Sequence, residues 1–171
     1  FYTQGKPKAM LPVDGKPMVQ CVLDCLAASK KIDQVLLVGL DESYQVSYPR
    51  RLTRLPNQGG MVANITIAAK HLLENGSTHD PQVLVMASDV PAVRPEMIDW
   101  LAGQVEGSDS DITYTVVTQE SMESRFPESH RSYIKLKDVV VCGGDVNAIN
   151  IKTVNYDNPL WTSLVNQRKN V

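Results

Sequence analysis

The strongest constraint on the fold of this chain is a pair of short apolar runs, each ended at once by glycine or polar residues. Residues 34–39 read Gln-Val-Leu-Leu-Val-Gly, and residues 82–88 read Gln-Val-Leu-Val-Met-Ala-Ser. Runs that are apolar at successive positions are typical of strands covered on both faces. We therefore expect two buried strands in a sheet that has helices on both sides.

Apolar residues at helical spacing precede and follow these runs. Three segments show this pattern: 17–30, which opens with Pro17; 61–74, which Gly76 ends; and a segment that begins at Pro95. The polar stretch between the first strand and the second helix contains Pro49 and Pro56, which we expect to break any regular element.

The last third of the chain has a different pattern. We expect a third strand over 111–118, a hairpin of 131–136 and 139–142, a further strand over 146–151, and a last helix capped by Asn158. Residues 118–129 read as an exposed loop or lid. Together the elements predict a single α/β domain over 1–171, with three layers and a mixed, mainly parallel central sheet.

Composition excludes several classes of protein. The 171 residues are 43% hydrophobic and carry a net charge of −2, which argues against non-specific binding of nucleic acid or of an anionic membrane. The sequence holds no run of about 18 apolar residues, as a membrane span would require. Three cysteines with no Cys-x-x-Cys pair favour free thiols and a cytoplasmic location.

The first polar cluster precedes the first predicted helix. Lys8 and Lys16 flank a turn at Asp14-Gly15. Lysine is a mobile positive charge that suits phosphate, and helix N-termini favour anions as well. The alternative is a solvated loop with two surface lysines.

A second cluster, Asn57-Gln58-Gly59-Gly60, precedes the second predicted helix. Paired glycines allow a ligand to approach the backbone closely, and Gln58 and Asn64 could contact a base or a ribose. The alternative is a simple turn.

The third cluster, Ser88-Asp89-Val90-Pro91, lies at the end of a predicted strand, and Gly143-Gly144-Asp145-Val146-Asn147 adds a second carboxylate. Magnesium takes one or two protein carboxylates together with substrate phosphates. Two lysines and two carboxylates in one place would suit phosphoryl or nucleotidyl transfer. The alternative for Asp89 is a turn or a helix cap.

The segment Lys8-x-x-Leu11 with Gly15-Lys16-Pro17-Met18 resembles a conserved segment of the nucleotidyltransferase superfamily, and Ser88-Asp89-Val90-Pro91 resembles its magnesium-binding strand end. Gly143-Gly144-Asp145 is similar to a further glycine-rich element of such proteins. The group that the sequence resembles is that of MobA-like NTP transferases, which includes molybdenum-cofactor guanylyltransferases. The resemblance covers about residues 4–168 and implies a GT-A-like, Rossmann-type fold.

The resemblance also implies roles for individual residues. Lys8 and Lys16 would hold the triphosphate and act catalytically with Asp89. Gly15 would let the loop pass close to the triphosphate. The other expected sites are the nucleotide-binding residues Leu11, Pro12, Gln58, Gly59, Gly60 and Asn64, the Mg²⁺ ligands Asp89 and Asp145, and the acceptor-binding residues Arg131, Tyr133, Lys135 and Asn147.

The sequence departs from the superfamily at its start. These proteins begin with a strand and a Gly-rich loop upstream of the lysine segment, whereas only Gly5 precedes Lys8 here. That loop supplies backbone N–H groups to phosphate. We therefore expect that the chain is truncated, or recorded only where it is ordered, at both ends.

The expected function is Mg²⁺-dependent transfer of NMP from an NTP, with GTP or CTP favoured, to a phosphorylated acceptor with release of pyrophosphate. The alternative is a non-catalytic module that binds a nucleotide or sugar nucleotide. A glycosyltransferase of the same fold would need an Asp-x-Asp motif after a strand. The one such motif, Asp109-Ser110-Asp111, precedes a strand instead.

Overall fold

The computed structural model describes residues 3, 5–75 and 81–154. In chain order its elements are η1 Lys8–Met10, β1 Pro12–Val13, β2 Lys16–Pro17, α1 Met18–Ala28, β3 Gln34–Val38, β4 Arg51–Leu55, α2 Met61–Glu74, β5 Gln82–Met86, α3 Pro95–Val105, β6 Ile112–Thr113, β7 Val116–Thr118, α4 Gln119–Arg125, β8 Ile134–Lys135, β9 Val140–Gly143, β10 Val146–Asn150 and η2 Ile151–Thr153. The helix predicted after Asn158 and the glycine at position 76 lie outside the described residues.

The three amphipathic helices predicted from apolar spacing are confirmed as α1, α2 and α3. The prediction of a loop over residues 118–129 is wrong in part, because α4 occupies most of this segment. Thr118 caps this helix, since its side chain accepts a hydrogen bond from the Ser121 N–H. The helix has no buried residue, and so it lacks the apolar stripe that would have predicted it.

The strands form several small sheets rather than the predicted central, mainly parallel sheet, and that prediction is wrong for the described residues. β3 pairs in parallel with β4, whereas β5, β10 and β6 form an antiparallel sheet in the order β5-β10-β6. β3 and β5 each have a partner on one edge and do not pair with each other. β4 was not predicted. Pro49 and Pro56 lie on either side of it and so do not interrupt its hydrogen bonds.

The predicted strand over 111–118 is broken into β6 and β7. At the break the Thr115 N–H donates to Asn147 Oδ1 at 2.9 Å, and the Thr115 carbonyl accepts from the Gly144 N–H at 2.8 Å. The chain therefore leaves the edge of β10 and joins the edge of β9. The predicted hairpin is confirmed as β8 and β9, which close with β7 into a third sheet.

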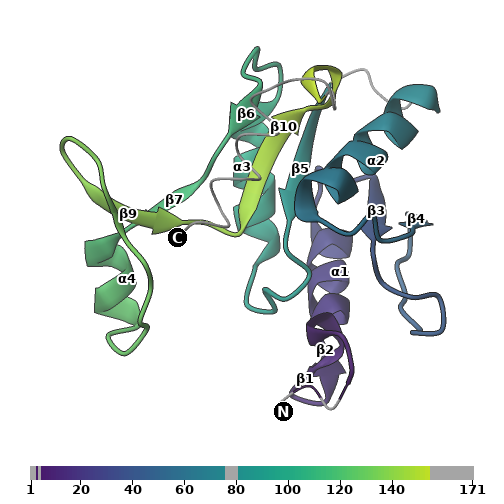
Figure 1. Cartoon of the computed structure of the whole chain (residues 1–171), viewed down its shortest axis with the longest axis horizontal. Helices are drawn as coiled ribbons and strands as arrows, with labels where there is room; N and C mark the ends of the chain where they lie inside the picture. Colours follow the sequence, from purple (N-terminus) through teal and green to yellow (C-terminus); the bar gives the residue numbers. More distant parts are fainter. Residues whose placement is uncertain (1–2, 4, 76–80, 155–171) are drawn as a thin grey trace.

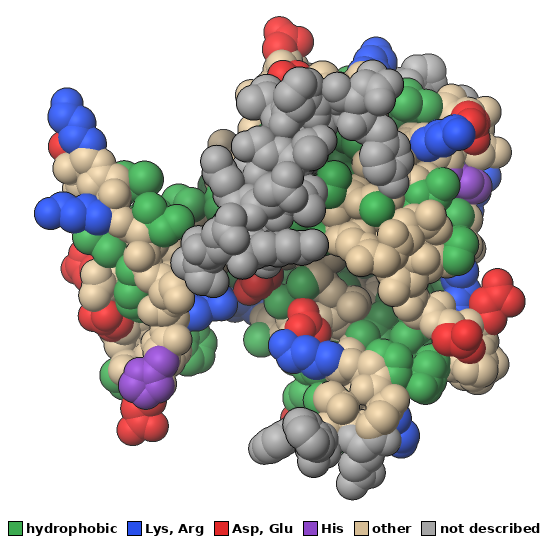
Figure 2. Space-filling model, in the orientation of Figure 1, with side chains coloured by type: hydrophobic (Ala, Val, Ile, Leu, Met, Phe, Trp, Pro, Cys, Tyr) green, Lys and Arg blue, Asp and Glu red, His purple; other side chains and the backbone are tan. Residues whose placement is uncertain are grey.

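Helices cover both faces of the main strands. α2 packs with Leu36 of β3 and Val83 of β5, whereas α1 and α3 pack with Val35 and Leu84 on the opposite face. The layers are thus helix, strands, helix (Figure 1). α4, β7 and β9 project to one side as an arm (Figures 1 and 2).

The two strands expected to be buried are more exposed than predicted. Leu37 is the one buried residue of β3, and all five residues of β5 are partly exposed. The cysteines are free thiols, as predicted. In the described part of the chain, no helix is both long enough and apolar enough to cross a membrane.

Candidate active site

The centre of the candidate site is an ion pair between Lys8 and Asp89. Lys8 Nζ lies 2.6 Å from Asp89 Oδ2, which joins η1 to the turn that follows β5. The hydrogen bond to Asp89, together with its negative charge, raises the pKa of Lys8. The Lys8 side chain is 70% exposed, so its ammonium is accessible to a ligand.

The second predicted carboxylate lies in the same region. The Asp145 carbonyl accepts a hydrogen bond from the Ala87 N–H at 3.2 Å, two residues before Asp89. The negative charge of Asp145 also contributes to the raised pKa of Lys8. Arg131 Nη2 lies 3.5 Å from Asp145 Oδ2. The structure therefore brings two carboxylates and two cations together at one end of β5 and β10.

The chemistry of this donor set fits a magnesium ion. Carboxylate oxygens are the ligands that Mg²⁺ takes, and one or two from the protein suffice when substrate phosphates supply others. The described residues contain no cluster of three or more His, Cys, Asp or Glu side chains that could hold a metal by itself. A metal at Asp89 and Asp145 would thus depend on a phosphate ligand.

A cavity of about 1020 Å³ extends from Lys8 and Asp89 along β3 and β5. Its wall at the Asp89 end also includes residues of the loop and first turn of α2, namely Asn57, Gly59, Gly60 and Asn64. This volume is at the upper end of the range for small-molecule sites, roughly 300–1000 Å³.

Side chains of the loop itself fix its conformation. Asn57 Oδ1 accepts from the Gly59 N–H at 3.0 Å, and Asn64 Oδ1 accepts from the Gln58 N–H at 2.7 Å. Gly59 has φ of +81°, which favours glycine. Part of the hydrogen-bonding capacity of the Asn64 side chain is therefore used within the protein and not for a ligand. The Gln58 side chain donates to the Pro56 carbonyl and lies off the cavity wall.

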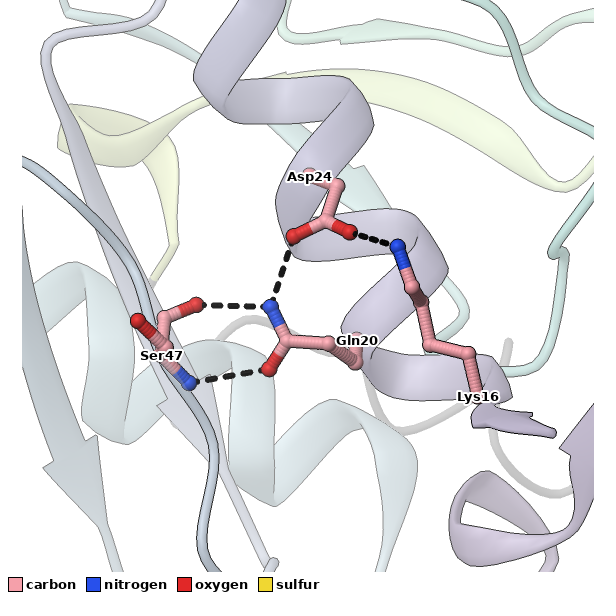
Figure 3. Close-up of polar contacts among 4 residues, drawn as sticks. All are labelled: Lys16, Gln20, Asp24 and Ser47. Atoms are coloured by element: carbon pink, nitrogen blue, oxygen red, sulfur yellow. Dashed lines mark hydrogen bonds and ion pairs between the residues drawn. The ribbon is translucent and has the colours of Figure 1, made fainter.

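Lys16 lies against α1 rather than at the Lys8 cluster (Figure 3). Lys16 Nζ is 2.5 Å from Asp24 Oδ2, and Gln20 links Asp24 to the backbone of Ser47. The hydrogen bond between Lys16 and Asp24 raises the pKa of Lys16 and lowers that of Asp24.

The predicted turn between the lysines is confirmed. Asp14 and Gly15 have φ of 49° and 79° and connect β1 to β2. Gly15 thus has the positive φ that this turn requires. Leu11 and Pro12 lie off the cavity wall, and the Leu11 carbonyl accepts from the Met18 N–H at 3.0 Å.

The residues expected to face an acceptor are divided between two regions. Arg131 reaches Asp145, whereas Lys135 is exposed on β8. The Tyr133 hydroxyl is buried, with no hydrogen-bond partner among the described residues, and burial raises its pKa. Asn147 accepts a hydrogen bond from the Thr115 N–H and so fixes the break between β6 and β7 against β10.

Two features of the site were missed or read differently from the sequence. Asn57 was not singled out, although an Asn two residues before Gly is a signal for a side-chain-stabilised turn. Close packing explains why glycine occupies positions 143 and 144. A Cβ on Gly143 would lie 2.5 Å from the Tyr114 hydroxyl, and one on Gly144 would lie 2.2 Å from Thr115 Oγ1.

Comparison with known sequences identifies a family. The profile described as the MobA-like NTP transferase domain matches residues 3–156. A comparison with curated proteins finds no match.

Comparison with solved structures finds a hypothetical transferase from Thermus thermophilus, with a TM-score of 0.75 and 28% identity; the match covers 95% of this chain and 64% of that one. The present chain thus spans less than two thirds of that relative.

Two more distant structures share the fold. One is CMP:2-keto-3-deoxy-manno-octonic acid synthetase in complex with CTP, with a TM-score of 0.62, 12% identity, and coverage of 98% of this chain and 80% of that one. The other is 4-diphosphocytidyl-2C-methyl-D-erythritol synthase, with a TM-score of 0.62, 14% identity, and coverage of 95% and 81%. The chain therefore has a nucleotidyltransferase-like α/β fold.

Proposed function

Because the chain belongs to the MobA-like NTP transferase domain family, we propose that it acts as a single domain that transfers NMP from an NTP to a phosphorylated small-molecule acceptor and releases pyrophosphate. The observation that carries the proposal is the Lys8–Asp89 ion pair on the wall of a large cavity, with Asp145 close enough for its charge to act on Lys8. Transfer of this kind depends on positioning and on neutralising charge at the reacting phosphate.

Lys8 supplies positive charge to the triphosphate. Its ammonium is exposed and carries three donors, so a phosphate oxygen can reach it and exchange with the Asp89 carboxylate. Lys16 is the second phosphate ligand, and its flexible side chain must leave Asp24 to serve as one. An NTP therefore competes with a carboxylate at each lysine.

Asp89 and Asp145 would hold Mg²⁺, and when bound this ion neutralises charge on the triphosphate. The protein's own contribution is to fix both carboxylates. Asp145 is tied to β5 through the Ala87 N–H, and Arg131 balances its charge.

The base lies against the 57–60 loop and the start of α2, where Gly59, Gly60 and Asn64 line the cavity. CTP and GTP are the nucleotides to test first, since one structure of the same fold contains CTP. The acceptor approaches from Arg131, Tyr133 and Lys135, on the side of the arm.

The test has two measurements. Thermal stability is followed with ATP, GTP, CTP and UTP, each with and without Mg²⁺, and pyrophosphate release is then followed with a panel of phosphorylated sugars and alcohols. We expect Mg²⁺-dependent stabilisation by one NTP, and pyrophosphate release that Asp89→Asn abolishes. Glu74→Gln is the matched control, because it removes the carboxylate of the exposed Lys70–Glu74 ion pair on α2, away from the cavity wall. Equal turnover in wild type and Asp89→Asn would show that the assignment of Asp89 is wrong.

A second candidate is a module that binds a nucleotide or sugar nucleotide without catalysis. The position of Lys16 favours it, because this lysine pairs with Asp24 on α1 and so lies away from the carboxylates that would hold a metal in the transfer reaction. Stabilisation by an NTP with no pyrophosphate release from any acceptor would support this candidate.

A further inference from the structure

The side-chain amide of Asn57 has a nitrogen with no hydrogen-bond partner among the described residues. Asn57 lies in the loop between β4 and α2 and lines the cavity. Its oxygen, Oδ1, accepts from the Gly59 N–H at 3.0 Å and from Asn64 Nδ2 at 3.2 Å. An amide oxygen has two lone pairs, so both are in use, whereas the nitrogen, Nδ2, keeps two hydrogens for a ligand.

Backbone donors fix which atom of each amide is the oxygen. A backbone N–H can only donate, so the Asn57 atom that faces the Gly59 N–H must be the oxygen. For the same reason, the Asn64 atom 2.7 Å from the Gln58 nitrogen is the oxygen, and the Asn64 nitrogen faces Asn57. Turning the Asn57 amide over would place its nitrogen against two donors. The group that Asn57 offers to a ligand is therefore a donor.

The backbone at the end of β3 packs beside the same side chain. The Gly39 N–H donates to the Leu55 carbonyl at 2.9 Å, which joins the ends of β3 and β4. A Cβ on Gly39 would lie 3.5 Å from Asn57 Cβ. Gly39 has φ of +87°, a conformation that favours glycine. Asn57 is thus held between a strand end and its loop partners, so that little conformational entropy is lost when it binds a ligand.

The neighbouring polar side chains of this loop have partners within the protein. Gln58 Nε2 donates to the Pro56 carbonyl at 3.0 Å, and Gln58 lies off the cavity wall. Asn64 uses its oxygen on the Gln58 N–H and its nitrogen on Asn57. Asn57 is therefore the side chain of the loop best placed to contact the edge of a base.

A group that can only donate distinguishes among the four bases. Guanine, cytosine and uracil each carry a carbonyl oxygen that can accept from such a group, whereas adenine carries none. The N7 acceptor of adenine lies beside the N6 amino group, which is itself a donor. A donor directed at that edge of adenine meets a second donor, and the amino group is left without an acceptor.

We propose that Asn57 determines the base specificity of the nucleotide site: its Nδ2 donates to a carbonyl oxygen of the base and so disfavours ATP. The inference rests on the nucleotide site of the proposed function and not on the transfer reaction. The ring of the base lies against Gly59 and Gly60, which line the cavity and carry no side chain. The triphosphate extends toward Lys8, on the wall of the same cavity.

Asn57→Asp tests this role, because it replaces the donor with an acceptor of the same shape. One carboxylate oxygen keeps the hydrogen bonds from the Gly59 N–H and Asn64 Nδ2, so the loop should keep its conformation. Isothermal titration gives the dissociation constants of ATP, GTP, CTP and UTP for the wild type and the variant. The added negative charge weakens the binding of every triphosphate. The readout is therefore the ratio of the dissociation constant of ATP to that of the NTP that the wild type binds most tightly.

For the wild type we expect GTP, CTP or UTP to bind most tightly, and ATP to bind about tenfold more weakly or worse. The tightest of the three identifies which carbonyl-bearing base the site takes. Asn57→Asp should lower the ratio by about tenfold or more, because a carboxylate repels a carbonyl oxygen and can accept from the amino group of adenine. The ranking of the four NTPs by the wild type does not depend on how well the variant folds.

Asn150→Asp is the matched control. Asn150 Oδ1 accepts from the Lys152 N–H at 3.0 Å, so this side chain bonds two residues ahead, as Asn57 does with Gly59. Asn150 lies off the cavity wall. The substitution adds the same charge and keeps the same kind of turn, and it should leave the ratio unchanged.

Two results would overturn the inference. One is a wild type that binds ATP as tightly as any other NTP, and the other is a ratio that is the same in the wild type and in folded Asn57→Asp. Failure of every NTP to bind would reject the nucleotide site, and with it both the proposed function and this inference. The expected ratios without pyrophosphate release would support the inference and reject the transfer reaction.

Discussion

Lys8 Nζ and Asp89 Oδ2 lie 2.6 Å apart, and this ion pair connects the start of the described chain to the end of β5. A second pair, between Arg131 and Asp145, lies beside it. Each carboxylate of the site thus has a cationic partner from another segment of the chain. An anionic ligand gains access to these cations by exchanging with the carboxylates, and a metal bound to the carboxylates would release the cations for phosphate.

This exchange predicts that Lys8→Met weakens NTP binding and leaves stability nearly unchanged. The side chain is 70% exposed, and exposed ion pairs contribute little to folding. A lost hydrogen bond between a charged donor and phosphate weakens binding by about tenfold or more. Isothermal titration with the NTP that stabilises the wild type measures the change.

Lys70→Met is the control for this prediction, because Lys70 pairs with Glu74 on the outer surface of α2. It should leave NTP affinity unchanged. An equal loss of affinity in both variants would mean that general charge, and not the position of Lys8, governs binding.

The meeting of Asp89 with Asp145 could be predicted from the sequence because polar residues directly follow or precede strands. Pairing of β5 with β10 then brings the two carboxylates to one edge, with Val146 opposite Met86. The position of Lys16 could not be predicted in this way. Its partner Asp24 lies on the following helix. The spacing of residues along the chain does not show whether Lys16 pairs with Asp24 or binds a ligand.

The predicted central sheet failed for a different reason. The apolar runs at β3 and β5 do have the composition of central strands, but pairing requires an adjacent strand, and the described residues provide none between them. β4 and α4 were missed because β4, Arg-Leu-Thr-Arg-Leu, lacks the regular alternation of a strand and lies between two prolines, and α4 buries no residue.

The glycine at position 144 is predicted to be required for packing. A Cβ there would lie 3.1 Å from the Thr115 carbonyl oxygen and 2.2 Å from its side-chain oxygen. Because the carbonyl oxygen also accepts the Gly144 N–H, the backbone cannot move away freely. We expect Gly144→Ala to lower the free energy of unfolding by about 1–3 kcal/mol in urea denaturation.

Gly103 offers a matched control within α3. A Cβ there meets no atom within 4 Å, and the residue lies inside a helix. Gly103→Ala should therefore raise the free energy of unfolding by up to about 1 kcal/mol. Stabilisation by both substitutions would contradict the packing reason given for Gly144.

A buried hydroxyl connects the end of α1 to α3 and gives the fold an acid-sensitive contact. Ser29 is 2% exposed; its Oγ donates to Asp99 Oδ1 at 2.5 Å and accepts from the Lys31 N–H at 3.1 Å. The hydrogen bond from Ser29 lowers the pKa of Asp99, with smaller contributions from the Lys30 and Lys31 N–H groups. Ser29→Ala leaves these partners without the hydroxyl and should lower the free energy of unfolding.

The lowered pKa of Asp99 fixes the direction of the pH dependence. A carboxyl with a lower pKa in the folded state stabilises the fold above its unfolded value, roughly 3.9, and loses this contribution as the pH falls through the folded value. Ser29→Ala should therefore be clearly less stable than wild type at pH 7, and the difference should shrink below about pH 4. Urea denaturation of both proteins at pH 7, 5 and 3 measures it. A difference that stays constant across this range would mean that the Ser29 hydroxyl stabilises the fold without regard to the charge on Asp99.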